Sequence, residues 1–233
     1  TSFVSPKAVP QMADASELYA RLPLDKGVNY QALVPNEKGY ERAVAAGAQT
    51  VALVLASTEG MNVNNIGMSL ERAIEVNIGV IKRAKREGII PRSYISTAVG
   101  CPYEGDVAPT AVADLSLKLL ELGCEEISLG DTTGVGTPAK AQTLVDTVAD
   151  KVPVAKLAAH FHDTYGQALA NLLAALQMGV ATIDSSVAGL GGCPYAKGAS
   201  GNVATEDVVY MLDGLGIKTG IDLEKLAETG SWI

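Results

Sequence analysis

The chain has 233 residues, a length that suits one sizeable domain built around a single buried core. Hydrophobic residues make up 48% of the chain and charged residues 19%, a composition that excludes an intrinsically disordered protein. The net charge of -8 and the absence of a dense Lys/Arg block argue against a nucleic-acid binder, and no apolar run approaches the ~18 residues of a membrane helix.

Strands and helices are predicted to alternate along the chain. Short apolar runs predict six strands, at about residues 31–35, 50–56, 94–99, 126–129, 156–162 and 182–188. Helical periodicity and helix-start signals predict helices at about residues 36–47, 69–88, 110–123, 137–150, 164–178 and 205–212. Such an alternation predicts parallel strands joined by crossover helices.

The ends of the predicted strands favour one of two α/β architectures. Six βα units fit either a doubly wound sheet or an incomplete barrel. Polar residues follow nearly every strand, and a (β/α)8 barrel builds its site from many strand ends, whereas a doubly wound sheet uses one switch point. We therefore expect a single (β/α)8 TIM-barrel domain over residues 1–233. About six βα units would be present, the first one or two strands would be absent, and the domain would be incomplete at the N-terminus and at the C-terminus.

Both histidines of the chain, His160 and His162, lie at the end of one predicted strand. Strand side chains two residues apart point the same way, so the two imidazoles should share the interior side of the barrel. Two neutral imidazoles in this arrangement are a natural pair of metal ligands, although they can also be ordinary polar residues at a strand end. The amide oxygen of Asn202 would complete a mixed site suited to Mg²⁺ or Mn²⁺, but Asn202 can equally be a helix cap.

A glycine-rich loop, residues 191–201, carries Cys193. Glycine lets such a loop move and approach a ligand closely, so its cysteine could serve as a general acid or base when the loop closes. The alternative is an incidental loop thiol. Cys124 lies at a helix–strand join and is interpreted as structural, whereas Cys101 has no assigned role. An odd count of three cysteines indicates reduced thiols and not a disulfide scaffold.

Two acidic residues are further candidates. Asp131 ends a predicted strand, where a carboxylate can bind metal, bind substrate, move a proton or only cap the turn. Glu206 lies four residues after Asn202, so it could face the same site. It could equally be an acidic first-turn residue that interacts with the helix dipole.

Five segments closely resemble the 3-hydroxy-3-methylglutaryl-CoA (HMG-CoA) lyases of the DRE-TIM metallolyase superfamily. They are residues 1–7, 100–105, 128–132, 160–171 and 187–202. The resemblance covers essentially the whole chain. The segment around Cys193 is the most specific, because related condensing enzymes and aldolases carry the H-x-H pair but not this loop.

The resemblance implies a metal-dependent lyase that cleaves (S)-HMG-CoA to acetyl-CoA and acetoacetate by a retro-Claisen reaction. His160, His162 and Asn202 match metal ligands, and His160 is also the candidate base for the tertiary hydroxyl. Cys193 is expected to help protonate the acetyl-CoA enolate. The remaining matches are Asp131 and Glu206, which are linked to activity, and Ser128 and Tyr94, which are expected to line the substrate pocket.

The chain departs from the family pattern at its start. The family begins its barrel with a strand that bears an Arg-Asp pair, in which the Asp is a metal ligand and the Arg the expected enolate stabiliser. Neither is present in this chain. We expect a truncated form and, if the chain starts at Thr1, an open barrel with weak metal binding and little activity.

Two other functions stay open at this point. One is a related acyl-CoA/ketoacid condensing enzyme or aldolase, which the Cys193 loop argues against. The other is a truncated, non-catalytic binding or assembly module, which the missing strand supports and the retained site residues oppose. The expected partners are a small-molecule acyl-CoA and a second copy in a homodimer, with no nucleic acid and no membrane. The expected compartment is the cytoplasm if the protein is bacterial and the mitochondrial matrix if it is eukaryotic.

Overall fold

The computed structural model describes residues 1–24, 26–192 and 201–233. The chain forms two compact units. Unit 1 consists of Thr1–Ser96 and Asp114–Ser128, and unit 2 consists of Thr97–Ala113 and Leu129–Ile233. Two elements cross from one unit into the other: α5 (Pro109–Leu122) and β6 (Glu126–Asp131).

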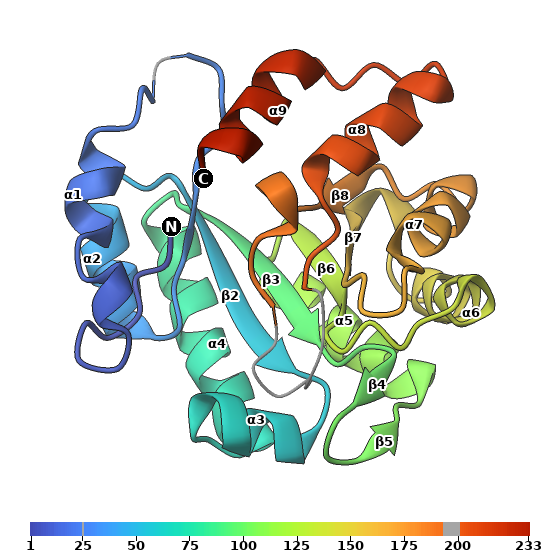
Figure 1. Cartoon of the computed structure of the whole chain (residues 1–233). Coiled ribbons are helices and arrows are strands. Elements are labelled where there is room, and N and C mark those ends of the chain that lie inside the picture. Colours follow the sequence, from blue (N-terminus) through green and yellow to red (C-terminus); the bar gives the residue numbers. More distant parts are fainter. Residues whose placement is uncertain (25, 193–200) are drawn as a thin grey trace. The chain divides into compact units, whose positions relative to one another are not determined.

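Unit 1 contains three strands and the helices that pack on them. Its elements are η1 (Pro10–Met12), α1 (Ala15–Ala20), β1 (Gln31–Leu33), α2 (Glu37–Ala45), β2 (Thr50–Ala56), α3 (Glu59–Ile66), α4 (Leu70–Arg86) and β3 (Ile90–Ser96). The amphipathic helix α4 packs along β2 and β3 (Figure 1). Six of the seven residues of β2 are buried, as expected for a strand that is covered on both faces.

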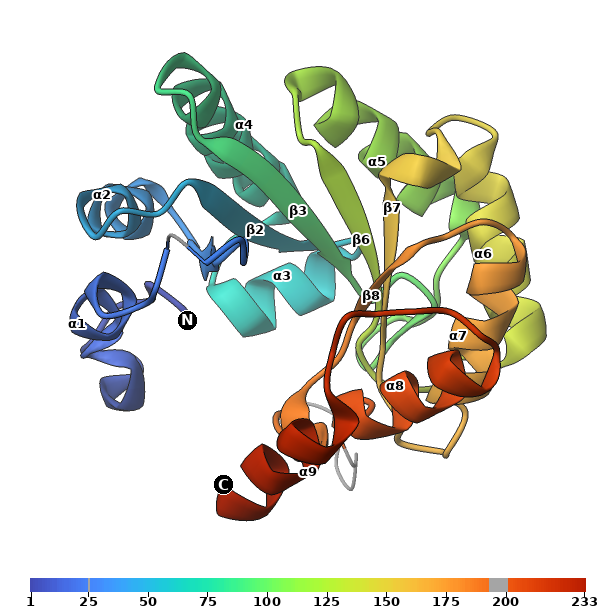
Figure 2. The same ribbon diagram turned by 90° about the horizontal axis from the view of Figure 1, so that it is seen from above.

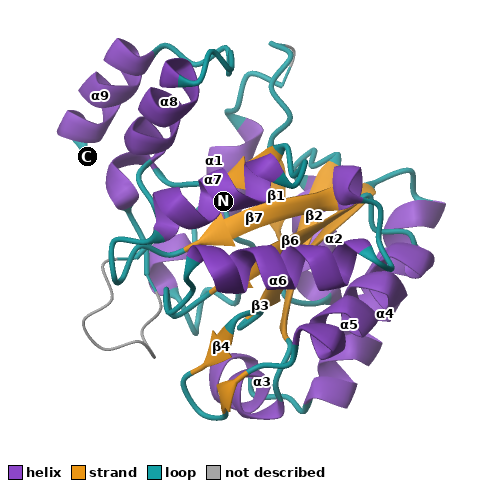
Figure 3. Cartoon of the chain, turned by 90° about the vertical axis from the view of Figure 1, so that its right-hand side faces the viewer, coloured by secondary structure: helices purple, strands orange, loops and turns teal. Residues whose placement is uncertain are grey.

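Unit 2 contains the later strands and the rest of the helices. Its elements are β4 (Gly100–Cys101), β5 (Gly105–Asp106), α6 (Pro138–Ala149), η2 (Val154–Lys156), β7 (Leu157–Phe161), α7 (Ala168–Gln177), β8 (Thr182–Asp184), η3 (Val187–Gly189), α8 (Thr205–Gly214) and α9 (Leu223–Trp232). Helices α6 and α7 lie side by side, and α7 packs on β7 (Figure 2). Helices α8 and α9 also contact each other, and β4 and β5 form a short antiparallel hairpin (Figure 3).

The main sheet has the strand order of a (β/α) barrel. Its six strands follow the order β1-β2-β3-β6-β7-β8, and the pairs β1–β2, β2–β3 and β7–β8 are parallel. Apart from the β4–β5 hairpin, neighbours in the sheet are also neighbours along the chain, so the order never reverses. A doubly wound sheet reverses its strand order at a switch point. The TIM-barrel class and the count of six βα strands are therefore confirmed for the described residues.

Local sequence signals explain several helix starts. Asn36 caps α2, because its side chain accepts a hydrogen bond from the Gly39 amide at 3.0 Å. Ser69 caps α4 in the same way, through the amide of Arg72 at 3.2 Å. These caps satisfy amides that have no partner within the helix. Thr137 caps α6 with proline at the first helical position, as the sequence predicted.

Other boundaries differ from the prediction. Strand β3 begins at Ile90 and not at Tyr94. It includes Pro91 as its second residue, because a proline, which has no amide hydrogen, is tolerated near the start of a strand. The same strand ends at Ser96, since Thr97 has a left-handed φ of 58°. Helix α7 begins at Ala168 and not near residue 164, because the Asp163 carboxylate accepts the Ala168 amide at 2.8 Å and holds the intervening residues in a turn.

Strand β8 covers only three of the predicted residues, and the chain then turns into η3. The elements α1, α3, α9 and the β4–β5 hairpin were not predicted. Each helix of the described residues is too short or too polar to cross a membrane.

Candidate active site

The two histidines lie together at the carboxyl end of β7. Their ring centroids are 5.4 Å apart and their planes are tilted by 45°. His162 is buried, with 7% of its surface exposed, whereas His160 is partly exposed. The rings are close neighbours because residues two apart on a strand share one side. The expected juxtaposition of the two imidazoles is therefore present.

His162 is held in its neutral form. Burial and the neighbouring His160 ring lower the pKa of His162 to about 4, although a hydrogen bond with the Asn202 side chain acts in the opposite direction. The Nδ1 atom of His162 is buried and has no hydrogen-bond partner among the described residues. A neutral imidazole with an unused ring nitrogen is the form that binds a metal ion.

Asp184, on β8, lies beside His160 and was not singled out from the sequence. It is the register partner of His160, and its Oδ2 lies 3.7 Å from His160 Nδ1. The carboxylate therefore faces this ring nitrogen across a distance that is longer than a hydrogen bond. The signal for Asp184 in the sequence was weak, because one acidic residue in a predicted strand gives no indication of its neighbour.

Asn202 joins the histidine pair to the base of the glycine-rich loop. The backbone of Asn202 pairs with that of His162 in an isolated antiparallel bridge. The side-chain Nδ2 of Asn202 donates to the Leu190 carbonyl oxygen at 2.9 Å, and the backbone amide of Asn202 donates to the Gly191 carbonyl oxygen at 3.3 Å. Asn202 does not cap α8, whose first residue follows Ala204.

The two ends of the loop approach each other so closely that glycine is required. A Cβ atom added to Gly201 would lie 1.7 Å from the Gly191 carbonyl oxygen, and Gly201 has a φ of +94°. The Gly201 carbonyl oxygen also accepts the Asp163 amide at 2.8 Å, which ties this end of the loop to the segment after β7. We refer to residues 189–191 and 201–202 as the loop stem. Cys193 itself lies outside the described residues.

Asp131 is buried at the end of β6. Its Oδ2 accepts a hydrogen bond from the Gly136 amide at 2.8 Å, while its Oδ1 has no partner in the part of the chain that the structure describes. Burial raises the pKa of the Asp131 carboxyl, although amides of the 134–136 turn act in the opposite direction. The His162 amide donates to the Asp131 carbonyl oxygen at 3.3 Å, so this acid borders the histidine pair. Such a carboxyl holds a proton more readily than an ordinary aspartate does.

Glu206 lies in the first turn of α8, and its carboxylate reaches the backbone of η3. Both carboxylate oxygens lie 3.0 Å from the Ala188 amide, which donates to them. Ala188 has a φ of 54°, a conformation that is rare for residues other than glycine. A Cβ atom on Gly230 of α9 would lie 2.5 Å from Glu206 Oε1, so α9 packs closely against this contact. The structure thus places Glu206 against the turn that leads into the loop stem.

The two residues expected to line the substrate pocket belong to unit 1. Ser128 is fully buried on β6. The Tyr94 ring, on β3, lies under the Arg92 guanidinium, whose Cζ is 4.6 Å from the ring centroid. Arg92 is also buried and forms an ion pair with Glu126. Their roles toward substrate stay predictions.

The two described cysteines are buried, and neither forms a disulfide with another described residue. Burial raises the pKa of Cys124 to about 12, which supports its interpretation as a structural residue. Cys101 lies in β4 and lines a cavity of about 440 Å³ with Thr133, Thr164 and Tyr165. The hairpin places Cys101 in unit 2.

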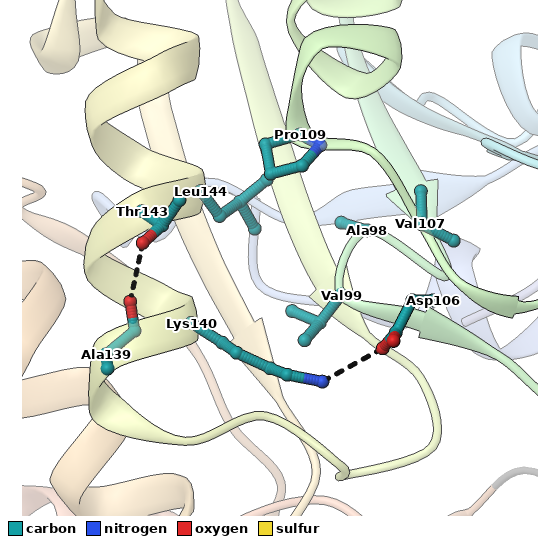
Figure 4. A pocket seen from close by; sticks show the side chains of 9 residues that line it. All are labelled: Ala98, Val99, Asp106, Val107, Pro109, Ala139, Lys140, Thr143 and Leu144. Carbon is teal, nitrogen blue, oxygen red and sulfur yellow. Dashed lines mark hydrogen bonds and ion pairs between the residues drawn. The ribbon is translucent and has the colours of Figure 1, made fainter.

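A second cavity of unit 2 lies between the start of α5 and α6. It has a volume of about 310 Å³ and is lined mainly by apolar side chains such as Val99 and Leu144 (Figure 4). At its rim, Lys140 Nζ lies 3.0 Å from the Asp106 carboxylate, and both side chains are largely exposed. None of the residues expected for catalysis lines this cavity.

The residues at the end of β7 fit part of a metal site. Two imidazoles and an amide lie together, and one buried ring nitrogen is unused. Within residues 1–24, 26–192 and 201–233, no group of three or more His, Cys, Asp or Glu side chains could hold a metal ion. His160, His162 and Asn202 could therefore supply only part of a ligand set, which further oxygen ligands or water would have to complete.

A barrel strand order with paired imidazoles, an amide and a buried carboxyl at the strand ends is the arrangement of a (β/α)-barrel enzyme, whose site lies at the carboxyl ends of its strands. The chain belongs to the HMGL-like family, whose pattern matches residues 10–233. It is 57% identical over all 233 residues to the mitochondrial hydroxymethylglutaryl-CoA lyase of Rattus norvegicus and covers 72% of that protein. The family resemblance inferred from the sequence is thereby confirmed.

Solved structures agree with this assignment. The hydroxymethylglutaryl-CoA lyase of Pseudomonas aeruginosa is 51% identical, with a TM-score of 0.95, over 99% of this chain and 77% of that chain. An HMG-CoA lyase from Acinetobacter baumannii, solved in complex with coenzyme A and 3-methylmalate, is 37% identical with a TM-score of 0.92, over 98% of this chain and 75% of that chain.

Proposed function

We propose that this protein is a lyase that cleaves (S)-3-hydroxy-3-methylglutaryl-CoA to acetyl-CoA and acetoacetate. One observation carries the proposal: the whole chain matches HMG-CoA lyases at more than half identity. The geometry agrees, because the paired imidazoles, Asn202 and Asp131 lie together at the carboxyl ends of β6 and β7.

The reaction requires one proton removal, one bond cleavage and one proton addition. A base takes the proton of the tertiary hydroxyl, and the oxygen lone pair forms the ketone of acetoacetate. The bond between C2 and C3 breaks, and its electron pair passes to C2 as the thioester enolate. Protonation of C2 then gives acetyl-CoA, so atoms and charge balance.

A divalent cation, which we propose to be Mg²⁺ or Mn²⁺ held in part by His160, His162 and Asn202, supplies Lewis acidity that makes the hydroxyl proton easier to remove. Metal dependence is a general property of the family. The neutral state of His162 suits such a role, since a protonated imidazole has no lone pair to offer.

The chain's own residues have distinct proposed roles. His160, which lies beside Asp184, is the candidate base for the hydroxyl. Asp131 has a raised pKa and one free oxygen, so it can pass a proton within the site. Cys193 is proposed to protonate the enolate at C2. Glu206 would support the loop stem through Ala188, and Ser128 and Tyr94 would line the pocket.

Acetoacetate production measured by a coupled assay tests the proposal. The purified protein should release acetoacetate and acetyl-CoA in equal amounts from HMG-CoA in the presence of Mg²⁺ or Mn²⁺. Cys193→Ala should lower kcat by about 10²–10⁴-fold, the usual contribution of a general acid or base. Absence of product from the wild-type protein with either metal would overturn the proposed activity.

Metal binding has a test that does not need activity. Calorimetric titration of Mn²⁺ should show binding that weakens in His162→Ala by at least tenfold, the usual scale for disturbing a metal site. Asn77→Ala, which removes a buried side chain far from both histidines in the sequence, is the control and should bind Mn²⁺ as the wild type does. Equal affinity in His162→Ala would remove His162 from the ligand set.

We also propose an acyl-CoA as the only partner besides a second copy of the chain. Light scattering after size exclusion should give the mass of a homodimer. For compartment, related lyases of Rattus norvegicus are named as mitochondrial and as cytoplasmic. We propose the mitochondrial matrix for a eukaryotic source and the cytoplasm for a bacterial one, which cell fractionation would test.

A further inference from the structure

The Asp131 carboxylate is held from one side by a tight turn. Residues 134–136 curl back after β6, and the Gly134 amide donates to the Asp131 carbonyl oxygen at 3.2 Å. The Gly136 amide then donates to Asp131 Oδ2 at 2.8 Å. Because the other oxygen, Oδ1, has no partner among the described residues, the turn alone fixes which way the carboxylate points.

Asn171, on α7, holds this turn from behind. Its Nδ2 donates to the Gly136 carbonyl oxygen at 3.1 Å. The same glycine therefore receives a hydrogen bond from Asn171 through its carbonyl and gives one to Asp131 through its amide. Only 1% of the Asn171 surface is exposed, so water cannot replace this contact.

The three groups are packed without spare room. A Cβ atom on Gly136 would lie 2.6 Å from Asp131 Oδ2 and 3.2 Å from Asn171 Nδ2. Glycine at this position thus lets the carboxylate and the amide approach the same residue, each through one of its two flanking peptide groups. A shift of Asn171 therefore moves Gly136, and a shift of Gly136 moves the Asp131 carboxylate.

We propose that Asn171 is a positioning residue for the lyase reaction, because its amide fixes the 134–136 turn and the turn fixes the Asp131 carboxylate. The inference rests on the proposed function only where it expects that the loss of Asn171 lowers the rate of the lyase reaction. Asn171 does not touch the reacting atoms. Its contribution passes through Gly136 to Asp131.

Asn77 is a matched control for Asn171. It too is a buried asparagine in a helix, its Nδ2 donates to the Ala73 carbonyl oxygen at 2.8 Å, and its Oδ1 has no partner among the described residues. Asn77 lies in unit 1 on α4 and is not part of the candidate site. Substituting alanine at either position removes the same buried amide.

Steady-state kinetics with HMG-CoA separate positioning from stability. Asn171→Ala should lower kcat about tenfold with KM within about twofold of wild type, since one misaligned hydrogen bond corresponds to roughly a tenfold change in rate. Asn77→Ala should lower the midpoint of thermal unfolding to a similar extent and leave kcat within about twofold. Equal kcat values for the two variants would overturn the proposal.

A double-mutant cycle asks whether the effect passes through Asp131. In an Asp131→Asn background, Asn171→Ala should lower kcat less than about twofold, because the group that it positions is gone. An undiminished tenfold loss in that background would also overturn the proposal. If Asn171→Ala does not fold, Asn171→Ser, paired with Asn77→Ser, takes its place.

The same cycle can be measured by urea unfolding, which does not depend on catalysis. The stability losses of Asp131→Asn and Asn171→Ala should be smaller together than their sum, and strict additivity would contradict the coupling. If the wild-type protein released no acetoacetate, the proposed function would fail while this unfolding cycle still decided whether Asn171 acts on Asp131.

Discussion

Substitution of Gly201 by alanine tests whether the close approach of the two halves of the loop stem matters for stability and turnover. The added Cβ would lie 1.7 Å from the Gly191 carbonyl oxygen, whereas real Cβ contacts stay beyond 3.0 Å, so the two chain segments must separate by at least about 1.3 Å. Two hydrogen bonds are affected: from the Asp163 amide to the Gly201 carbonyl oxygen, and from the Asn202 amide to the Gly191 carbonyl oxygen.

The magnitude follows from these contacts. An alanine in the left-handed region costs about 1–2 kcal/mol, and two weakened hydrogen bonds add about 1–3 kcal/mol. Gly216→Ala is the matched control, because Gly216 has a φ of +74° and no atom within 4 Å of the added Cβ. It carries the conformational cost of the left-handed alanine without the collision. Gly201→Ala should therefore lose about 2–5 kcal/mol of unfolding free energy, and Gly216→Ala only about 1–2 kcal/mol.

Urea unfolding and acetoacetate release measure the two consequences. Because the stem also orients Asn202 and leads to Cys193, displacement by about 1 Å should lower kcat about 100-fold in Gly201→Ala. Gly216→Ala should keep the wild-type kcat. If the two variants had the same unfolding midpoint and the same kcat, the stem would not be the rigid base that its contacts indicate.

Three further predictions concern single contacts. Hydrogen bonds from Arg83 and from Tyr40 hold the pKa of Glu87 below its ordinary value. Tyr40→Phe should therefore lower the Tm by a few degrees at pH 7. The difference in Tm between this variant and the wild type should vanish as the pH falls below that lowered pKa. Cys124 should stay unlabelled by iodoacetamide in the folded protein at pH 8.5, because burial raises its pKa to about 12, and mass spectrometry of digested protein would reveal any modification. Glu206→Gln should keep kcat within about fivefold of wild type, since an amide oxygen can still accept one hydrogen bond from Ala188. Glu206→Ala should lower kcat about tenfold or more. Identical kinetics for the two variants would show that the contact of Glu206 with Ala188 does not affect turnover.

Local chemistry made much of the fold predictable. The helix starts after Asn36, Ser69 and Thr137 depend on side chains that bond to amides three residues ahead, so a short window of sequence contains the whole signal. Strand β2 was predicted at both ends, since its apolar run is continuous and is bounded by polar residues. The end of β3 was not predictable, because a threonine such as Thr97 gives no indication that its backbone will be left-handed.

The candidate site was predictable only in part, for a related reason. His160 and His162 share a side because of strand geometry, which two positions in the sequence suffice to predict. The approach of Asp184 to His160 depends on the register of β7 with β8, and the support of Glu206 for Ala188 depends on how α8 follows η3. Such contacts between elements distant in sequence have no local signature.

The loop stem has an evolutionary consequence. Gly201 faces Gly191 at a separation that no other residue can enter, and Asn202 is bonded to both Leu190 and Gly191. Natural variation should therefore be filtered at these few anchor positions by backbone geometry, independently of any chemistry that their side chains supply. In an alignment of lineages, the anchors would mark where the segment begins and ends.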